Sequence, residues 1–376
     1  MLAEMLLAAE RAVRGRGVEP ARVRRVLVLE YRLPLGCVVH LTPVFEAMKR
    51  SRPEIEIAVA TRGLGLEVLR HSRFVDHLVE APDPTVELGA AVWGLQRELR
   101  WRGFKPECVL TGASDQRTRI ALMGMLGARG WRGGFTVSPG LYQRPLGYDA
   151  GLSLIGNNLR LAKMIGCEAE MTRPRVFFSE GDAAKARELL REVNPEGRPV
   201  VVMVTQNSGG QNTGWHEERF VAVIRNAAER GFAVVYVGTA GDAASVEGIR
   251  AAAEGVGTSI AGRTSVSELS AVLAMSDWMV TLDTGTMHVG RAVGVPMVVL
   301  GPSWQKPVEW MPLGVENVRV LRGEDREGVP EGYRLDEIEA EAVIAALGEL
   351  VEIYPAAEEA RNARVGEGVD LLGGSE

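Results

Sequence analysis

The residues of this 376-residue chain best placed to do chemistry are Asp283, Thr284, Gly285 and His288. The apolar run 279–282 predicts a buried strand, and 286–293 predicts the helix that follows, with Gly294 at its end. A turn from a strand into a helix presents free backbone N–H groups and the positive end of the helix dipole, which together can hold a diphosphate without a metal. His288 lies about one helical turn further on. A bare Asp-Thr-Gly turn is also common as a simple connection, so the sequence around it must decide.

Three spaced signatures continue from this turn. Asp-Thr-Gly-x-x-His occupies 283–288, Ala-x-Gly-x-Pro occupies 292–296, and a second apolar strand ends in Leu-Gly-Pro-Ser at 300–303. The stretch 304–321 follows, with Trp310, Pro312, Leu313 and Gly314. This succession resembles the donor-site signature of glycosyltransferase family 9, which includes the lipopolysaccharide heptosyltransferases. The resemblance extends over about 26–321 and is strongest in its last third.

The resemblance implies an α/β fold of GT-B architecture, with two doubly wound Rossmann-like domains facing a cleft. It also implies an inverting, metal-independent transferase that moves a heptose-like sugar from a nucleotide-diphosphate sugar to a lipopolysaccharide-core or related glycan acceptor. The nucleotide-sugar is then a co-substrate, and no cofactor is expected. Such a reaction needs a base for the acceptor hydroxyl, and positive charge or N–H donors for the leaving diphosphate.

The base position departs from the family pattern. Family members have an Asp after a Gly in the first strand-to-helix turn, whereas this chain reads Leu-Gly-Cys-Val-Val-His at 35–40, so Cys37 occupies that position. A helix N-terminus can lower a thiol pKa from about 8.5 to below 7.5, which would make Cys37 a thiolate near neutral pH. An inert thiol is an equally good interpretation. His40 is the second candidate base, although a lone histidine more often packs a helix.

The expected phosphate site shows a parallel departure. After the strand 200–204, the family has a phosphate-binding Lys where this sequence has Thr213. Asn207, Ser208 and Thr213 could still contact a phosphate, but they carry no charge to offset the leaving group. Asp242 follows the next strand, where the family approaches the nucleotide ribose. It could accept from ribose hydroxyls or serve as a helix N-cap, and capping is slightly favoured.

Composition excludes several other kinds of site. The spacing of the cysteines and histidines is not that of metal ligands. These residues are Cys37, Cys108, Cys167, His40, His71, His77, His216 and His288. Unpaired cysteine spacing favours a reducing compartment. Because no apolar run approaches the roughly 20 residues of a membrane span and no signal peptide is recognisable, we expect a cytoplasmic protein.

Charge is distributed unevenly along the chain. Lys and Arg outnumber Asp and Glu in 1–178, whereas acidic residues dominate the remainder. A basic first half could face an anionic acceptor or make peripheral contact with the inner face of a membrane. A basic surface that is merely solvated is about equally favoured. Nothing in the sequence indicates nucleic-acid binding.

Elements that would position these residues alternate between short apolar strands and amphipathic helices, which predicts parallel doubly wound sheets. We expect an N-terminal helical extension at 1–20, an acceptor-side Rossmann-like domain at 21–178, a donor Rossmann-like domain at 179–354 and a flexible tail at 355–376. The Gly-, Pro- and aromatic-rich stretch 130–145 is expected to be an acceptor-facing loop.

Two other functions are compatible with these patterns. A catalytically degenerate relative would bind a nucleotide-sugar or glycan without efficient transfer, because Cys37 and Thr213 replace expected family residues. Another GT-B-like enzyme, such as a nucleotide-sugar epimerase, would share the fold, since fold alone does not fix function. Only a turnover assay separates the three.

Overall fold

The computed structural model describes residues 18–32, 34–207, 214–329 and 331–369. The chain divides into two compact units, Met1–Pro174 and Arg175–Glu376, whereas the sequence suggested a boundary at 178. Of the N-terminal extension expected at 1–20, residues 1–17 lie outside the described residues. A short 3-10 turn, η1 (Pro20–Arg22), precedes the first strand.

The first unit is built on a parallel sheet with the order β3-β2-β1-β4-β5-β6. Its strands are β1 (Arg25–Leu29), β2 (Glu56–Thr61), β3 (His77–Glu80), β4 (Cys108–Thr111), β5 (Trp131–Phe135) and β6 (Arg144–Leu146). At the carboxyl end of β1, Leu29 lies opposite Ala60 of β2 and Thr111 of β4. Strand order therefore reverses between β1 and β4, the place where open sheets of this kind bind ligands.

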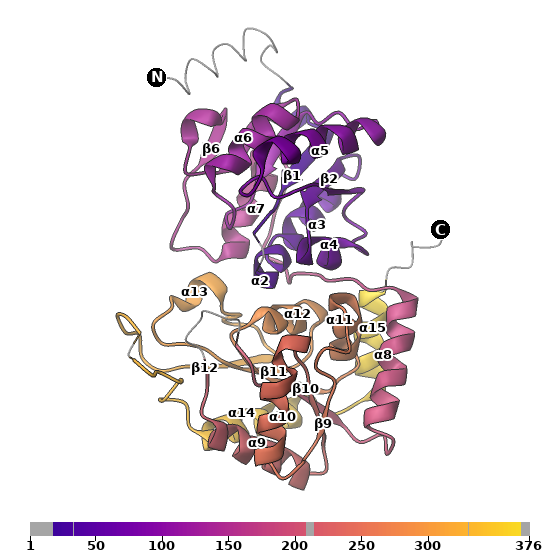
Figure 1. Cartoon of the computed structure of the whole chain (residues 1–376), viewed down its shortest axis with the longest axis vertical. Helices are drawn as coiled ribbons and strands as arrows, with labels where there is room; N and C mark the ends of the chain where they lie inside the picture. The colour runs from indigo at the N-terminus through magenta and orange to yellow at the C-terminus, as the bar shows by residue number, and fades with distance from the viewer. Residues whose placement is uncertain (1–17, 33, 208–213, 330, 370–376) are drawn as a thin grey trace. The chain divides into compact units, whose positions relative to one another are not determined.

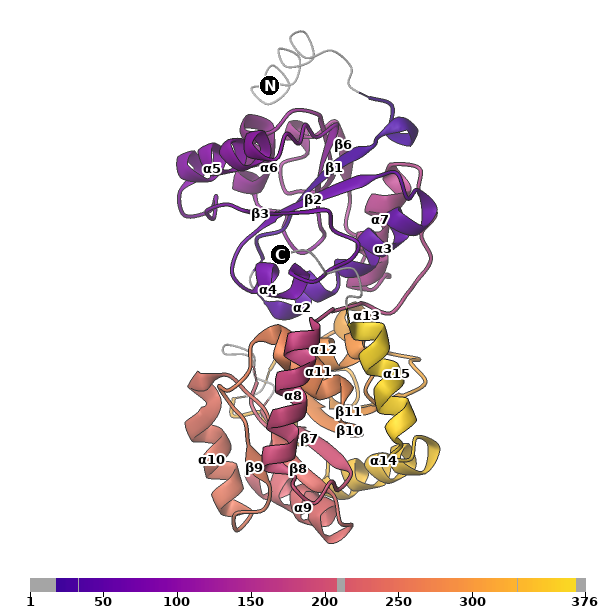
Figure 2. The same ribbon diagram turned by 90° about the vertical axis from the view of Figure 1, so that its right-hand side faces the viewer.

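Helices cover both faces of this sheet (Figure 2). They are α2 (Leu35–Val39), α3 (Thr42–Ser51), α4 (Leu64–Leu69), α5 (Leu88–Trp101), α6 (Thr118–Gly127) and α7 (Leu154–Met164), with a 3-10 turn, η2 (Pro139–Leu141), after β5. α5 packs against α6, and α3 packs against α7. The central strands are consequently buried on both sides, which is why β1 is a continuous apolar run from Val26 to Leu29.

The second unit repeats this plan, with the order β12-β11-β10-β7-β8-β9. Its strands are β7 (Val200–Val204), β8 (Ala233–Tyr236), β9 (Thr258–Ser259), β10 (Trp278–Leu282), β11 (Met297–Leu300) and β12 (Val318–Leu321). β10 pairs with β7 on one side and with β11 on the other. The reversal of strand order therefore falls between β7 and β10.

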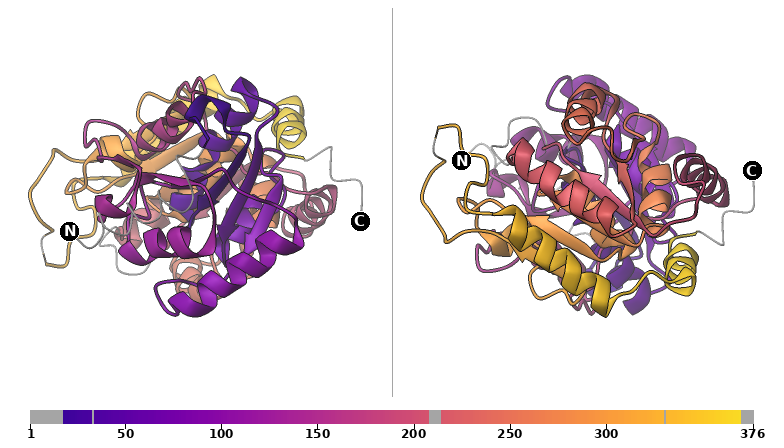
Figure 3. Two further views of the ribbon diagram at one scale, coloured as in Figure 1. Left: turned by 90° about the horizontal axis from the view of Figure 1, so that it is seen from above. Right: turned by 90° about the horizontal axis from the view of Figure 1, so that it is seen from below.

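The helices of the second unit again form two layers (Figures 1 and 3). They are α8 (Glu180–Val193), α9 (Glu217–Glu229), α10 (Ala243–Ala252), α11 (Val266–Ala274), α12 (Gly285–Val293), α13 (Pro307–Trp310), α14 (Ala340–Ile353) and α15 (Glu358–Gly368), and the 3-10 turn η3 (Ala240–Asp242) precedes α10. α9 packs against α10 and α14, whereas α11 packs against α8, α12 and α15. Two doubly wound α/β units confirm the predicted fold class.

The stretch 130–145 differs from its prediction as a loop, because it contains β5 and the start of β6. Glycines concealed this strand. A Cβ at Gly133 would collide with the sulfur of Met164, and a Cβ at Gly134 would collide with the backbone oxygen of Thr111. Gly134 also has a φ of 110°, which favours glycine. The residues that the packing requires here are thus ones with low β-propensity.

The C-terminal segment also differs from its prediction as a flexible tail. Within it, α15 packs against α11 and α12. Arg361 pairs with the buried Asp277, and Arg364 donates to two backbone carbonyls at the end of α11. Arginine contacts anchor this helix, and its polar composition therefore gave no apolar periodicity to detect. Residues 370–376 lie outside the described residues.

Candidate functional site

The Asp-Thr-Gly turn joins β10 to α12 in the second unit. Asp283 and Thr284 form the turn, Gly285 is the first residue of α12, and Gly294 ends the helix with a φ of 83°. The strand and the helix each begin one residue earlier than expected from the sequence, so Gly285 belongs to α12 and not to the turn. Since β10 is the strand beside β7, the turn lies at the carboxyl edge of the sheet where strand order reverses, the usual ligand position.

Thr284 is the N-cap of α12, yet its side chain does not cap the helix. It is only 7% exposed, and its hydroxyl oxygen has no hydrogen-bond partner among the described residues. The first N–H groups of any helix lack partners within the helix. The turn therefore combines a buried, unsatisfied hydroxyl with the positive end of a nine-residue helix, which suits an anion.

Asp283 is held from the loop that follows β11. With its amide oriented to satisfy both neighbours, Gln305 donates to Asp283 Oδ2 at 3.0 Å and accepts from the Trp310 indole at 3.2 Å. Burial raises the pKa of Asp283 to about 6. The loop itself is fixed by Arg322, which donates to the backbone oxygens of Pro302, Ser303 and Gln305. Sequence reasoning missed Gln305, for which no motif gave a signal.

His288 lies within α12 and is 4% exposed. Burial, and then the charge of Arg291, lower its pKa to about 3. Its ring centroid is 6.1 Å from that of Trp310. At neutral pH the imidazole is therefore uncharged, and it can offer a hydrogen bond but no positive charge. Arg291 itself stays cationic, although burial lowers its pKa to about 10.

The loop after β7 can be followed only in part. Asn207 is partly exposed, whereas Ser208 and Thr213 lie outside the described residues. Before them, Gln206 donates to the hydroxyl of Thr205 at 3.2 Å. The loop leaves the sheet from β7, next to the strand that carries Asp283. Asn207 and the Asp-Thr-Gly turn thus come from adjacent strand ends.

Asp242 has a capping role. Its Oδ2 accepts from the backbone N–H of Thr239 at 2.8 Å and from the Thr239 hydroxyl at 2.7 Å. The two residues form a reciprocal capping box at η3. The structural alternative considered for Asp242 is therefore present, and the side chain remains partly exposed.

Cys37 lies in α2 of the first unit and is 3% exposed. Burial, followed by the charge of Glu30, raises the pKa of its thiol to about 12. Of the two interpretations of Cys37, the raised pKa agrees with the inert thiol and not with a thiolate near neutral pH. A helix of only five residues gives a short run of aligned dipoles, and it does not overcome desolvation and a neighbouring carboxylate.

His40 is the C-cap of α2, and its backbone N–H donates to the oxygen of Gly36 at 2.9 Å. The residue is 1% exposed. Its own backbone oxygen accepts from the side-chain amide of Asn158 on α7 at 3.2 Å. The packing interpretation of this histidine thus agrees with its position, and both proposed base residues are buried.

A pair of buried carboxylates in the first unit was not anticipated. Glu30 directly follows β1, and Asp115 lies in the loop after β4; both have 0% exposure. Asp115 accepts from the backbone N–H of Tyr31 at 2.8 Å and pairs with Arg117 at 2.7 Å. The available signal was an acidic residue soon after each of two buried strands. Which strands are neighbours, however, is fixed by the fold and not by sequence spacing.

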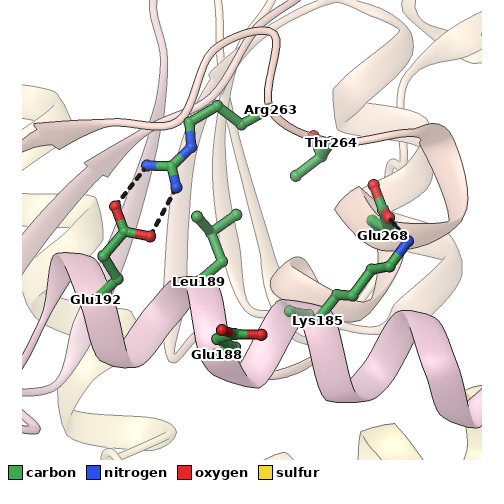
Figure 4. A pocket seen from close by; sticks show the side chains of 8 residues that line it. Lys185, Glu188, Leu189, Glu192, Arg263, Thr264 and Glu268 are labelled. Carbon is green, nitrogen blue, oxygen red and sulfur yellow. Dashed lines mark hydrogen bonds and ion pairs between the residues drawn. The ribbon is translucent and has the colours of Figure 1, made fainter.

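A polar groove of about 230 Å³ lies between α8 and the start of α11. Figure 4 shows that the Arg263 guanidinium faces Glu192 and that Lys185 faces Glu268. Arg263 contacts the two oxygens of Glu192 at 3.0 and 2.7 Å, and the Lys185 bond is 2.9 Å. Both cations are thus neutralised within the protein. Among the described residues, no three His, Cys, Asp or Glu side chains gather as a metal site would require.

Comparisons with known proteins agree with this geometry. The model of glycosyltransferase family 9 (heptosyltransferase) matches residues 121–334, which is more than half of the chain. That range contains the second sheet, with the Asp-Thr-Gly turn, and the last strands of the first. A comparison of the sequence with curated proteins finds no match.

Three solved structures share the fold. A family 9 glycosyl transferase from Veillonella parvula has a TM-score of 0.77 at 20% identity, covering 88% of this chain and 98% of that one. The E. coli ADP-heptose lps heptosyltransferase II has a TM-score of 0.74 at 18% identity, covering 88% of this chain and 100% of that one. The E. coli heptosyltransferase WaaC with ADP has a TM-score of 0.66 at 18% identity, covering 87% of this chain and 99% of that one. At these low identities, what the comparison shows is a shared fold, that of GT-B proteins with two Rossmann-like units.

Proposed function

The chain belongs to glycosyltransferase family 9, and we propose that it moves a heptose-like sugar from a nucleoside diphosphate sugar to a lipopolysaccharide-core or related glycan. The E. coli structures with the same fold are named as heptosyltransferases, and one of them is a complex with ADP. We propose a single displacement in which the acceptor hydroxyl attacks opposite the leaving diphosphate, so that the anomeric centre inverts. The nucleotide-sugar is a second substrate, and no cofactor takes part.

The turn between β10 and α12 is the observation that carries this proposal. In the proposed complex, the N–H groups at Thr284 and Gly285 and the buried Thr284 hydroxyl bind the diphosphate. These donors are fixed before the reaction begins, so they stabilise the growing negative charge without reorganising. The helix dipole adds to the same effect. Because N–H groups and a dipole serve the leaving group, we propose that no divalent metal is required.

The other donor contacts in our proposal surround this turn. Asp283, held by Gln305, accepts a hydroxyl of the donor, and the neutral His288 donates a hydrogen bond without adding charge. We propose Asn207, Ser208 and Thr213 as further phosphate contacts, of which only Asn207 belongs to the described residues. Asp242 contributes its remaining oxygen to the ribose. Thr213 stands where the family has its phosphate-binding lysine, so we propose that the α12 N-terminus supplies positive potential to the diphosphate.

A second function, binding a nucleotide-sugar without transferring it, is favoured by one observation. The thiol at the family's base position is buried, and its pKa of about 12 keeps it protonated. A protonated thiol cannot accept the proton of the acceptor hydroxyl. His40 is then the remaining base candidate from the sequence, and a chain with no proton acceptor at all would bind the donor but react slowly.

The acceptor side offers a surface suited to an anionic membrane. On α5, Trp93 and Trp101 are 61% and 78% exposed, and Arg97 lies between them on the same helical face, its guanidinium 5.0 Å from the Trp93 ring centre. Tryptophan favours the membrane interface, and arginine is attracted to anionic headgroups. We propose that this face makes peripheral contact with the membrane holding a glycolipid acceptor. Within the described part of the chain, no helix is both long and apolar enough to cross it.

The test begins with donor binding to the full chain. ADP and ADP-heptose should each raise the melting temperature, because a ligand that binds only the folded state stabilises it. Gly285→Val should remove that rise by placing a branched side chain where the diphosphate approaches. Gly285 does not have a positive φ, so the substitution leaves the backbone unstrained. Gly248→Val on α10 is the matched control, because a side chain there meets nothing within 4 Å.

Turnover then separates transfer from mere binding. ADP release from ADP-heptose, with mass analysis of a lipopolysaccharide-core acceptor, should show a transferred sugar of inverted configuration. Binding without product would favour the second function. An unchanged melting shift in Gly285→Val would place the donor away from the α12 turn and remove the support on which the proposal rests.

A further inference from the structure

The carboxyl edge of the first sheet holds a polar group that the proposed donor site does not use. Glu30 follows β1, while Ser114 and Asp115 follow β4. These two strands are neighbours, and strand order reverses between them. Glu30 and Ser114 therefore meet at the ligand-binding position of the first unit, as the Asp-Thr-Gly turn does in the second.

Glu30 is fixed by two contacts. Its Oε1 accepts from the backbone N–H of Arg32 at 2.9 Å, and its Oε2 accepts from the Ser114 hydroxyl at 3.2 Å. The side chain is fully buried, whereas Ser114 is partly exposed. Gly112 leaves room for the carboxylate, since a Cβ there would lie 3.2 Å from Oε2. Ser114 is thus a partly exposed residue whose side chain contacts the buried carboxylate directly.

Charged groups from each neighbouring segment act on Glu30. Asp115, after β4, disfavours its ionised form, whereas Arg117 favours it. From the turn after β1, Arg32 contributes a backbone N–H, and Cys37 on α2 is a neutral thiol close enough for Glu30 to raise its pKa. Desolvation dominates and raises the pKa of Glu30 to about 8. A carboxylate of this kind is a much stronger base than an ordinary one.

Cys37 and Glu30 are both close to the same serine. Ser114 acts on the Cys37 thiol and lowers its pKa, against the larger effect of burial, so the residue at the family's base position and the buried carboxylate both lie near one hydroxyl. The thiol is protonated and cannot accept a proton. The carboxylate on the other side of Ser114 is able to.

We propose that Ser114 and Glu30 form a relay that accepts the proton of the acceptor hydroxyl. As the acceptor oxygen bonds to the anomeric carbon and the diphosphate leaves, the acceptor proton passes to Ser114 Oγ, and the hydroxyl proton of Ser114 passes to Glu30 Oε2. Serine ends as it began, and the carboxylate ends neutral. This inference rests on the proposed transferase function and assigns its base to residues other than Cys37 and His40.

Glu30→Gln is the main test, because the amide can still accept from Arg32 and contact Ser114 but cannot take up a proton. With ADP-heptose and the lipopolysaccharide-core acceptor, we expect kcat to fall about 100-fold or more, while the acceptor KM and the ADP-induced melting shift stay unchanged. Wild-type kcat/KM should rise with pH and level off above about 8. Asp115→Asn should move that midpoint to lower pH, because removing a like charge makes Glu30 more acidic.

Glu107→Gln is the control. Glu107 is also a carboxylate that accepts from backbone N–H groups, those of Arg24 and Arg25, but it precedes β4 at the opposite edge of the sheet. Its substitution should leave kcat and the pH profile as in the wild type. The single variant Ser114→Ala should lose activity as Glu30→Gln does.

The outcomes separate this inference from the proposed function. If the wild type transfers the sugar and Glu30→Gln has the same kcat and pH profile, the relay is overturned but the proposed transferase function is not. A wild type that binds ADP but transfers nothing would overturn both. Loss of activity in His40→Ala but not in Glu30→Gln would assign the proton to His40.

Discussion

Replacing Glu30 with glutamine should make the protein more stable while making it less active. Burial, with help from Asp115, raises the pKa of Glu30 from 4.5 to about 8, so the folded state retains a proton that the unfolded chain releases. The stability that comes from a raised pKa is fully present below pH 4.5 and is lost as pH rises through 8. Glutamine occupies a similar volume and is neutral at every pH, so the variant avoids this loss.

The size of the effect follows from the two pKa values. The interval from 4.5 to about 8, at about 1.4 kcal/mol per pH unit, gives about 5 kcal/mol. The variant should therefore exceed the wild type in free energy of unfolding by about 1 kcal/mol at pH 5, about 3 at pH 7 and about 5 at pH 9. Groups that titrate alike in both proteins cancel from this difference.

Chemical denaturation of the full chain, followed by circular dichroism at the three pH values, measures this difference. Glu107→Gln again serves as the control for removing one carboxylate from the first unit. If the difference between Glu30→Gln and the wild type is the same at pH 5 and pH 9, Glu30 does not hold a proton in the folded state and the reasoning fails. A stabilised but inactive variant would be hard to explain by a structural role, since loss of a structural group lowers stability and activity together.

Three further predictions concern the base position, the metal and the membrane. Cys37→Asp alone should lower the melting temperature, because it adds a third carboxylate beside Glu30 and Asp115. The double variant Cys37→Asp with Glu30→Gln should transfer at least 10-fold faster than Glu30→Gln alone. An equal rate in these two variants would mean that position 37 does not reach the acceptor. Transfer should survive excess chelator, and strict dependence on added magnesium or manganese would contradict the mechanism. Trp93→Ala with Trp101→Ala should reduce binding to vesicles containing anionic phosphatidylglycerol at least several-fold, as measured by co-sedimentation, and equal binding by the double variant would place the membrane contact elsewhere.

The fold could be predicted because its strands are buried on both faces. Each central strand is a short apolar run, and several helices have a clear start or stop, such as the Ser265 capping box of α11 or Gly294 at the end of α12. β5 could not be predicted from an apolar run, because close packing requires glycines at Gly133 and Gly134. α15 could not be predicted from apolar periodicity, because Arg361 and Arg364 anchor it through polar contacts. Periodicity detects apolar burial, and it does not detect these two alternatives.

The candidate site could be predicted only where one turn holds all of its members. Asp283, Thr284 and Gly285 are contiguous, so their spacing alone indicates an anion-binding turn. Glu30 and Ser114 lie on separate strands, and no spacing rule connects them. The pKa of Cys37 could not be predicted for a related reason, because the sequence indicates the nearby helix N-terminus but not the carboxylate or the burial that oppose it.

The neutral Cys37 and the buried Glu30 are two parts of one electrostatic arrangement. Glu30 already shares its surroundings with Asp115, and burial there makes each additional negative charge costly. An ionised carboxylate at position 37 would lie near Glu30, and the two could not both be charged near neutral pH without raising one pKa further. A neutral residue at 37 lets Glu30 ionise at a lower pH than it otherwise would. Cysteine at the expected base position is therefore compatible with a working proton acceptor, provided that the carboxylate stands at Glu30 and reaches the acceptor through Ser114.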